Sequence, residues 1–368
     1  MNILCLDQFG ELGGAQRCLL DLLPAMIDRG WSVHLASPGG PLAERAAAMH
    51  ATVDRITCGP YSSGRKTPAD VARFAAATPR LCGEIRRLIS IHNADLIYVN
   101  GPRLLPAAAL AARQGPRVLF HSHSLLNGIA LRLAGRSLAM VRAAMVASCR
   151  FVAAPLAPYA RDRGIRVVYN GVRRMAAANR TGAAEFRIGV IGRISPEKGQ
   201  ADFLRAARLL SGLAPECRFV IRGAPLFSNP EAMRYARTLE ALAADLPVEF
   251  AGWTEDVDAV LATLDLLVVP STAVDATPRV ILEAFAAGVP VVAFASGGIP
   301  EIVEHGATGF LVEERSPKAL ALAIRNLLRE PDRLRRAAGM ARAKARSEFS
   351  LERYGQQMLQ AIEAAARS

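Results

Sequence analysis

The chain has 368 residues, a formal net charge of +12 and a hydrophobic fraction of 51%. This length predicts two domains, and no run of about 20 apolar residues predicts a membrane span. The basic charge favours an anionic partner, a phosphorylated substrate or an acidic membrane surface, and nucleic acid is disfavoured because no nucleic-acid motif is present.

The first residues run from an apolar stretch, NILCL, into an acid and glycines, without the basic segment that begins a signal peptide. The six cysteines are scattered and form no C-x-x-C pair. Neither a zinc site nor a disulfide scaffold is therefore expected, and a reducing cytoplasm is the predicted setting.

The first half of the chain predicts a parallel α/β domain. An apolar strand at 2–6 leads into the turn FGELGG and then into an amphipathic helix. Further buried strands are predicted at SVHLAS, ADLIYVN and RVLFHSH. Apolar runs that alternate with helical patterns are typical of parallel strands joined by crossover helices.

The same pattern begins again near residue 186. The strand FRIGVIG precedes the polar loop RISPEKG and the amphipathic helix QADFLRAARLLSGL. Five more strands are predicted: CRFVIRG, VEFAGW, LDLLVVPS, PVVAFAS and GFLV. The chain from Ser316 onward is predicted to be helical and basic.

We therefore predict two doubly wound, Rossmann-like α/β domains, at 1–171 and 186–345. Between them lies an aperiodic linker at 172–185, and 346–368 is a C-terminal helix that is a candidate for packing on the first domain. Ligands of such sheets bind at the carboxyl ends of the strands.

Gly13 and Gly14 follow the first strand, where glycines let the backbone approach a phosphate at a helix N-terminus. The full G-x-G-x-x-G fingerprint is absent, so a plain strand-to-helix turn stays an equal alternative. In GRISPEKGQ, Arg193 and Lys198 flank the turn after a strand, where two cations would neutralise a diphosphate. The alternative is that Ser195 and Pro196 cap a short turn and that both cations are solvated.

The stretch DATPRVILEAF holds Asp275 in a predicted loop and Glu283 inside a predicted helix, with Pro278 in its first turn. This arrangement suits a phosphate or sugar at the helix N-terminus, with each acid reaching a different hydroxyl pair. The alternative is a helix start with one acid near its positive end. His121 and His123 share one face at the end of a strand, where a polar contact with ligand and a structural imidazole both stay open.

Several strings occur in order over most of the chain: GGAQRCLLDL, VVYNGV, GVIGRISPEKG, LDLLVVPS, DATPRVILEAFAAGVPVVA and GGIPEIVEHGATGFLV. Together they resemble the nucleotide-sugar-dependent glycosyltransferases of family 4. The resemblance implies the GT-B fold, in which two Rossmann-like domains face one another across a cleft. It also implies a retaining transferase that moves a sugar from a nucleoside-diphosphate sugar to a glycan or lipid-linked glycan, with no cofactor.

The resemblance places the donor mainly on the second domain. Asp275 would contact hydroxyls of the sugar, Glu283 the ribose, and Arg193 with Lys198 the diphosphate. The backbone that would cradle phosphate comprises Thr277, Pro278, Arg279 and Val280.

In the first domain, Gly13 and Gly14 fall on the family's Gly-Gly loop. His123 best matches its cleft histidine, and His121 is the other candidate. Asp275 departs from the family, which usually has the longer glutamate there, so either its loop lies closer to the donor or the donor differs. Ala276 and Thr277 replace the more usual Gly-Phe, and the resemblance therefore does not define the sugar pocket. The absence of an acid cluster of the DXD kind suggests that no metal takes part, with Arg193 and Lys198 doing what a divalent ion does elsewhere.

The segment 127–150 carries Arg132, Arg136 and Arg142 on one arc of a predicted helix, among apolar residues. Such a helix could make a peripheral contact with an anionic membrane, as expected for a lipid-linked acceptor. An ordinary crossover helix packed on the sheet is the alternative. The alternative from a different class of function is a catalytically silent nucleotide-sugar-binding module of a glycosylation complex. The departure from the family at Asp275 is compatible with it.

Overall fold

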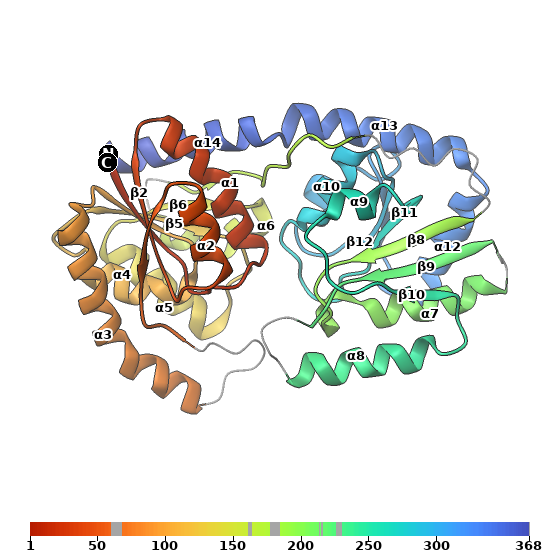
Figure 1. Ribbon diagram of the computed structural model, residues 1–368, viewed down its shortest axis with the longest axis horizontal. Coiled ribbons are helices and arrows are strands. Elements are labelled where there is room, and N and C mark those ends of the chain that lie inside the picture. The colour runs from red at the N-terminus through yellow and green to blue at the C-terminus, as the bar shows by residue number, and fades with distance from the viewer. Residues whose placement is uncertain are drawn as a thin grey trace. The chain divides into compact units, whose positions relative to one another are not determined.

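The computed structural model describes residues 1–59, 68–160, 164–176, 185–212, 214, 216–225 and 230–367 (Figure 1). The chain divides into two compact units. Unit 1 comprises Met1–Gly171 with Leu351–Ser368, and unit 2 comprises Val172–Ser350. Of the expected linker at 172–185, positions 177–184 lie outside the described residues.

Unit 1 contains a parallel sheet in the order β3-β2-β1-β4-β5-β6-β7. Its strands are β1 Asn2–Leu6, β2 Ser32–Ser37, β3 Thr52–Arg55, β4 Leu96–Val99, β5 Arg117–Ser122, β6 Ala144–Ala147 and β7 Arg166–Val167. The order reverses between β1 and β4, which pair in parallel. In sheets of this kind a ligand binds beyond the carboxyl ends of the strands at such a reversal.

The helices of unit 1 cover both faces of this sheet (Figure 1). They are α1 Gly14–Asp28, α2 Pro41–Ala48, α3 Pro68–His92, α4 Leu105–Ala111, α5 Gly128–Met140, α6 Arg150–Ala153 and α14 Leu351–Arg367. Side chains of β1 alternate between the two cores: Leu4 and Leu6 pack on the side of α3 and α4, and Ile3 and Cys5 on the side of α1 and α14.

The C-terminal helix α14 packs on α1 within unit 1. A side chain at Gly355 would approach the Ala25 Cβ at 3.2 Å, and the Tyr354 hydroxyl donates to the Cys18 carbonyl at 3.1 Å. The preceding helix α13, Pro331–Glu348, runs through position 345, where the sequence predicts a domain boundary. The chain leaves unit 2 at Ser350 instead.

The prediction of one basic helix over 127–150 is wrong in its second half. Helix α5 ends at Met140, Arg142 adopts a left-handed φ of 48°, and the apolar residues that follow form the buried strand β6. Four consecutive apolar residues complete a neighbour for β5, which outweighs their helical pattern. Arg142 therefore does not lie on the arc of Arg132 and Arg136.

Unit 2 contains a parallel sheet in the order β10-β9-β8-β11-β12-β13. Its strands are β8 Phe186–Ile191, β9 Cys217–Arg222, β10 Val248–Phe250, β11 Leu266–Val269, β12 Val291–Phe294 and β13 Phe310–Val312. Its helices are α7 Gln200–Ser211, α8 Pro230–Ala243, α9 Val257–Leu261, α10 Arg279–Ala287, α11 Ile299–Ile302, α12 Pro317–Leu328 and α13. The strand order reverses between β8 and β11, and the prediction of two doubly wound α/β units is confirmed.

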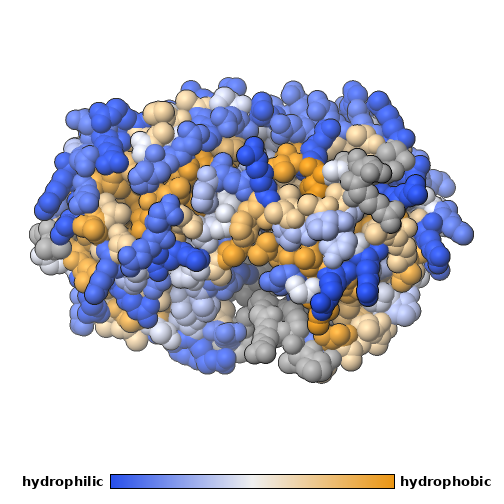
Figure 2. Space-filling model, turned by 180° about the vertical axis from the view of Figure 1, so that it is seen from behind, coloured by the Kyte–Doolittle hydropathy of each residue, from blue (hydrophilic) through white to orange (hydrophobic). Residues whose placement is uncertain are grey.

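The surface is polar over the last helices. Figure 2 shows hydrophilic side chains along the upper edge of the view, where Figure 1 draws α13 and α14. Within the described part of the chain, no helix combines the length and the apolar character that a bilayer span requires.

Candidate active site

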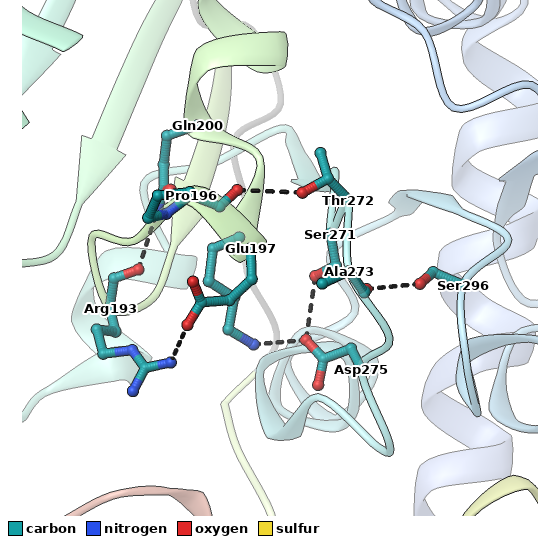
Figure 3. Close-up of polar contacts among 10 residues, drawn as sticks. Arg193, Pro196, Glu197, Gln200, Ser271, Thr272, Ala273, Asp275 and Ser296 are labelled. Atoms are coloured by element: carbon teal, nitrogen blue, oxygen red, sulfur yellow. Dashed lines mark hydrogen bonds and ion pairs between the residues drawn. The ribbon is translucent and has the colours of Figure 1, made fainter. Parts of the chain in front are cut away.

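Two loops meet at the reversal of strand order in unit 2. The loop after β8 carries Arg193 and Lys198, and the loop after β11 carries Ser271 and Asp275 (Figure 3). Because β8 and β11 are neighbours in the sheet, residues some 80 positions apart reach the same place. This is the edge at which a doubly wound sheet binds ligands.

Lys198 and Asp275 form an ion pair in this site. The Lys198 Nζ lies 2.5 Å from the Asp275 Oδ2, and the Ser271 hydroxyl donates to the same oxygen at 3.0 Å (Figure 3). The side chains are 30% and 18% exposed, so the cation is not simply solvated. The family resemblance implies that these two residues bind different parts of a ligand, and their contact with each other is not predicted from the sequence.

The loop after β8 is fastened to the loop after β11. The Thr272 N–H donates to the Glu197 carbonyl and its hydroxyl to the Pro196 carbonyl, each at 3.1 Å. Gly199 has a φ of 71°, and a Cβ there would lie 1.8 Å from the Pro270 carbonyl oxygen. Glycine is thus required both by the backbone conformation and by the close approach.

Arg193 is held at the base of the same loop. Its guanidinium lies 2.5 Å from the Glu197 carboxylate, and its carbonyl accepts from the buried Gln200 side chain at 2.8 Å (Figure 3). The short turn predicted around Ser195 and Pro196 is present as the 3-10 turn Pro196–Lys198. Lys198 ends this turn, Arg193 precedes it, and both cations have acidic partners.

The loop that carries Asp275 is fixed from its other side by the loop after β12. The Gly298 N–H donates to the Asp275 carbonyl at 2.9 Å, and the Ser296 hydroxyl donates to the Ala273 carbonyl at 2.7 Å. A Cβ at Gly297, whose φ is 59°, would lie 2.1 Å from the Asp275 carbonyl oxygen. The carboxylate is thereby held in a defined position without a helix of its own.

Helix α10 begins just after Pro278, which the sequence predicts in its first turn. Pro278 is its N-cap, with ψ of 114°, and Arg279 is the first helical residue. The N–H groups of the first turn, which include Val280, are the ones that a helix leaves without intrahelical acceptors. Thr277 is buried just before this turn.

Glu283 lies one turn into α10 and pairs with Arg279. The Arg279 Nε is 3.7 Å from the Glu283 Oε1, and the two side chains are 16% and 12% exposed. The family resemblance implies only a backbone role for Arg279, whereas its spacing of four residues from Glu283 is that of a helical ion pair. That spacing is the signal that identifies the contact.

In unit 1, Gly13 is the N-cap of α1 and Gly14 its first residue, as the sequence predicts. The Gly13 N–H donates to the Gln16 Oε1 at 3.2 Å. A Cβ at Gly14 would meet no described atom within 4 Å, so a side chain at this position would extend into open space.

The two histidines differ in exposure. His121 is fully buried, its Nδ1 lies 2.5 Å from the Tyr98 hydroxyl, and burial lowers its pKa well below the ordinary value. His123 is half-buried, and its ring is tilted by 41° against that of His121, with centroids 3.8 Å apart. The His123 Nε2 lies 2.8 Å from the Asn100 Oδ1. A neutral His121 thus lies against the ring of His123, which is the more exposed of the two.

Asp7 and Asn100 are polar residues that the sequence analysis misses. Each follows a strand directly, Asp7 after β1 and Asn100 after β4, and both are buried. A polar residue directly after a buried strand is the signal that identifies such positions. No group of three or more metal-ligating side chains occurs among the residues described in the structure.

Comparison with known proteins gives two family matches that follow each other along the chain. Residues 12–174 match the family described as Glycosyltransferase Family 4, and residues 185–330 match Glycosyl transferases group 1.

Curated relatives match about half of the chain, and the chain spans about half of their length. A GDP-mannose-dependent monoacylated alpha-(1-6)-phosphatidylinositol monomannoside mannosyltransferase of Corynebacterium glutamicum is 32% identical over 185 residues, which are 48% of this chain and 46% of the relative. Spore coat protein SA of Bacillus subtilis is 29% identical over 178 residues, 47% of each chain.

Solved structures match the whole chain. HepE of Anabaena in complex with UDP-glucose has a TM-score of 0.84 and 25% identity, covering 99% of this chain and 100% of the other. Sucrose-phosphate synthase of Thermosynechococcus elongatus has a TM-score of 0.82 at 20% identity and covers 100% of both chains, which bears on the fold alone.

Proposed function

The chain belongs to glycosyltransferase family 4, the glycosyl transferases of group 1, and we propose that it is a retaining, metal-independent transferase. Its donor would be a nucleoside-diphosphate sugar and its acceptor a glycan or a lipid-linked glycan. The observation that carries the proposal is the pairing of Lys198 with Asp275, beside Arg193, at the strand reversal of unit 2. A cation for a diphosphate and an acid for a sugar are thereby held in one site.

The donor would exchange contacts with this pair. Lys198 would turn from the Asp275 carboxylate to the diphosphate, and Asp275 would then accept hydrogen bonds from sugar hydroxyls. Arg193 would contact the same diphosphate, with the first turn of α10 supplying backbone N–H groups. Glu283, held by Arg279, would accept from the ribose hydroxyls.

The reaction would break the bond between the sugar's anomeric carbon and the diphosphate oxygen. Arg193 and Lys198 would stabilise the negative charge that develops on that oxygen, which is the term that usually contributes most to catalysis. The acceptor oxygen would attack from the same face, and its proton would pass to the departing phosphate. Retention then needs no dedicated base with a shifted pKa.

The acceptor would bind to unit 1, beside Gly13, Gly14 and His123. The exposed face of helix α5 is the reason to propose a lipid-linked acceptor. Ile129 is 65% exposed and lies on one stripe with Leu133 and Met140, flanked by the exposed Arg132 and Arg136. Its opposite face, with Ala134 and Leu138, is buried on the sheet, so the helix would both pack and touch an anionic bilayer.

Binding of a donor tests the proposal. A panel of nucleotide sugars, including GDP-mannose and UDP-glucose, should raise the melting temperature of the protein with at least one member. Lys198→Ala and Glu283→Ala should lose that shift, whereas Lys318→Ala, an exposed lysine on α12, should keep it. A full panel without any shift would contradict the donor site, and binding without hydrolysis or transfer would favour a silent binding module.

Flotation with vesicles tests the membrane contact. Vesicles that contain phosphatidylglycerol should carry the protein at low salt and release it at high salt, since exposed charges are screened. Replacing Arg132 and Arg136 together by Glu should abolish flotation without affecting donor binding. Flotation equal to that of the unchanged protein would exclude this face of α5 as the contact.

A further inference from the structure

Three polar side chains at the ends of neighbouring strands in unit 1 are joined by hydrogen bonds. Asp7 follows β1, Asn100 follows β4 and His123 follows β5, and these strands are neighbours in the sheet. Asp7 is 0% exposed and Asn100 3% exposed. The Asn100 Nδ2 lies 2.6 Å from the Asp7 Oδ2, and the Asn100 Oδ1 lies 2.8 Å from the His123 Nε2.

The acceptors around Asn100 decide how its amide is turned. An ionised carboxylate accepts hydrogen bonds and donates none, so Asp7 must face the NH2 group of Asn100. The second hydrogen of that group points to the Ala15 carbonyl at 3.2 Å. Turning the amide over would place its oxygen against two acceptors, and Oδ1 therefore faces His123.

The amide in turn decides the state of the histidine. Because the Asn100 Oδ1 can only accept, the His123 Nε2 must carry the proton. A neutral imidazole with its proton on Nε2 has an acceptor at Nδ1. We propose that Asp7 is a positioning residue, which through Asn100 fixes the proton of His123 on Nε2 and thereby makes Nδ1 the acceptor nitrogen of the ring.

The same carboxylate also orients the loop at the start of α1. The Gln16 Nε2 donates to both oxygens of Asp7, at 2.9 and 3.0 Å. By the same rule the Gln16 Oε1 must face away from Asp7, and it accepts from the Gly13 N–H. One carboxylate thus sets both the histidine and the Gly-Gly loop, which are the two groups of unit 1 that the proposed function assigns to the acceptor.

The buried negative charge of Asp7 destabilises the folded protein, so stability does not explain why an acid occupies this position. Burial raises its pKa to about 6, although hydrogen bonds from Asn100, Phe9 and Gln16 oppose the rise. A neutral side chain would fill this place with less desolvation. A carboxylate is needed here because only an acceptor without hydrogens turns both amides in the required direction.

The tautomer can be read directly by two-bond 1H–15N correlation spectra of the protein labelled in histidine. In the neutral form, His123 should carry its proton on Nε2 in the unchanged protein. In Asp7→Asn and in Asn100→Ala this signature should be lost or mixed. Asp95→Asn, an exposed residue that accepts from the Asn2 N–H at the other end of β4, should leave it unchanged.

Kinetics give the second reading, which depends on the proposed function. Asp7→Asn should lower kcat by about ten- to a hundredfold, the usual scale for a group that orients a reacting one. The affinity for the nucleoside diphosphate should stay unchanged, because its assigned partners belong to unit 2. A proton on the Nδ1 of His123 in the unchanged protein, or the same tautomer and kcat in Asp7→Asn, would overturn the inference. Failure of the proposed function would appear instead as loss of every nucleotide-sugar effect, with the tautomer result intact.

Discussion

Gly199 shows how closely the two loops of the candidate site are fitted together. Replacement by Ala would force a Cβ into the Pro270 carbonyl and hold a left-handed backbone that costs about 1–2 kcal/mol for a residue with a side chain. We expect Gly199→Ala to weaken donor binding more than tenfold and to lower the melting temperature.

A matched substitution separates these effects from the general cost of Gly→Ala. Gly212 ends the same helix α7, has a negative φ, and a Cβ there would meet no described atom within 4 Å. Gly212→Ala should leave both donor affinity and stability nearly unchanged. Equal behaviour of the two variants, measured by calorimetry and thermal unfolding, would contradict the packing of the loops.

Asp7 predicts a pH dependence of stability with a definite sign. Its pKa is about 6 in the folded protein and about 3.9 in an unfolded chain, so the unfolded state loses its proton first as pH rises. Between these values the folded state binds more protons, and the free energy of unfolding therefore falls with rising pH, by about 3 kcal/mol in total. Asp7→Asn should lack this loss.

Urea unfolding near pH 4.5 and near pH 7 measures this change in the free energy of unfolding, with Asp95→Asn as the control. Relative to the unchanged protein, Asp7→Asn should become more stable as the pH is raised. A constant difference between the two proteins over this range would show that Asp7 is ionised in both states.

At the scale of single residues, spacing along the chain identifies residues of the candidate site but not the contacts between them. Arg193, Lys198, Asp275 and Glu283 stand out because they lie at strand ends or helix starts. The contact between Lys198 and Asp275 depends on which strands are neighbours, since β8 and β11 are joined only in the folded sheet. The amide pairs of Asp7 depend on three strand ends in the same way.

At the scale of elements, apolar runs predict strands well where they are fully buried. All the predicted strands are confirmed, because parallel strands covered on both faces must be continuously apolar, whereas β3, β6 and β7 are not predicted. The sequence predicts a helix at strand β6, because its residues, AMVA, also suit a helix and follow α5 after only three residues. Tertiary pairing with β5 and β7 decides its state.

Helix α14 is expected to stabilise unit 1 through its apolar face rather than its charges. Ile362 is fully buried against the core that includes α1, whereas its neighbour Glu363 pairs with Arg29 on the surface. Ile362→Ala should lower the free energy of unfolding by about 2–4 kcal/mol, and Glu363→Ala by less than about 1 kcal/mol. Similar losses in denaturant unfolding would show that α14 contributes chiefly through its ion pair.

At the scale of the whole molecule, the two units differ in how the chain builds them. Unit 2 is one continuous segment, Val172–Ser350, with its own sheet and core, whereas unit 1 needs segments from both ends of the chain. The isolated segment 172–350 should therefore fold and bind a nucleoside diphosphate without catalysing transfer. The segment 1–171 alone, which lacks α14, should unfold at a lower temperature than unit 1 in the full chain.

The ion pair of Lys198 and Asp275 has a consequence for the end of a catalytic cycle. If the donor binds as proposed, Asp275 would act as an anion of the protein itself that competes with the spent nucleotide for Lys198, its partner in the ion pair. After transfer of the sugar, the carboxylate would lose its proposed hydroxyl partners and would recapture Lys198, which would expel the diphosphate. Asp275→Asn should remove this competitor, so the product nucleotide should bind more tightly and inhibit more strongly, even as the intact donor loses its sugar contacts. Product dissociation followed by stopped flow would reveal the slower release.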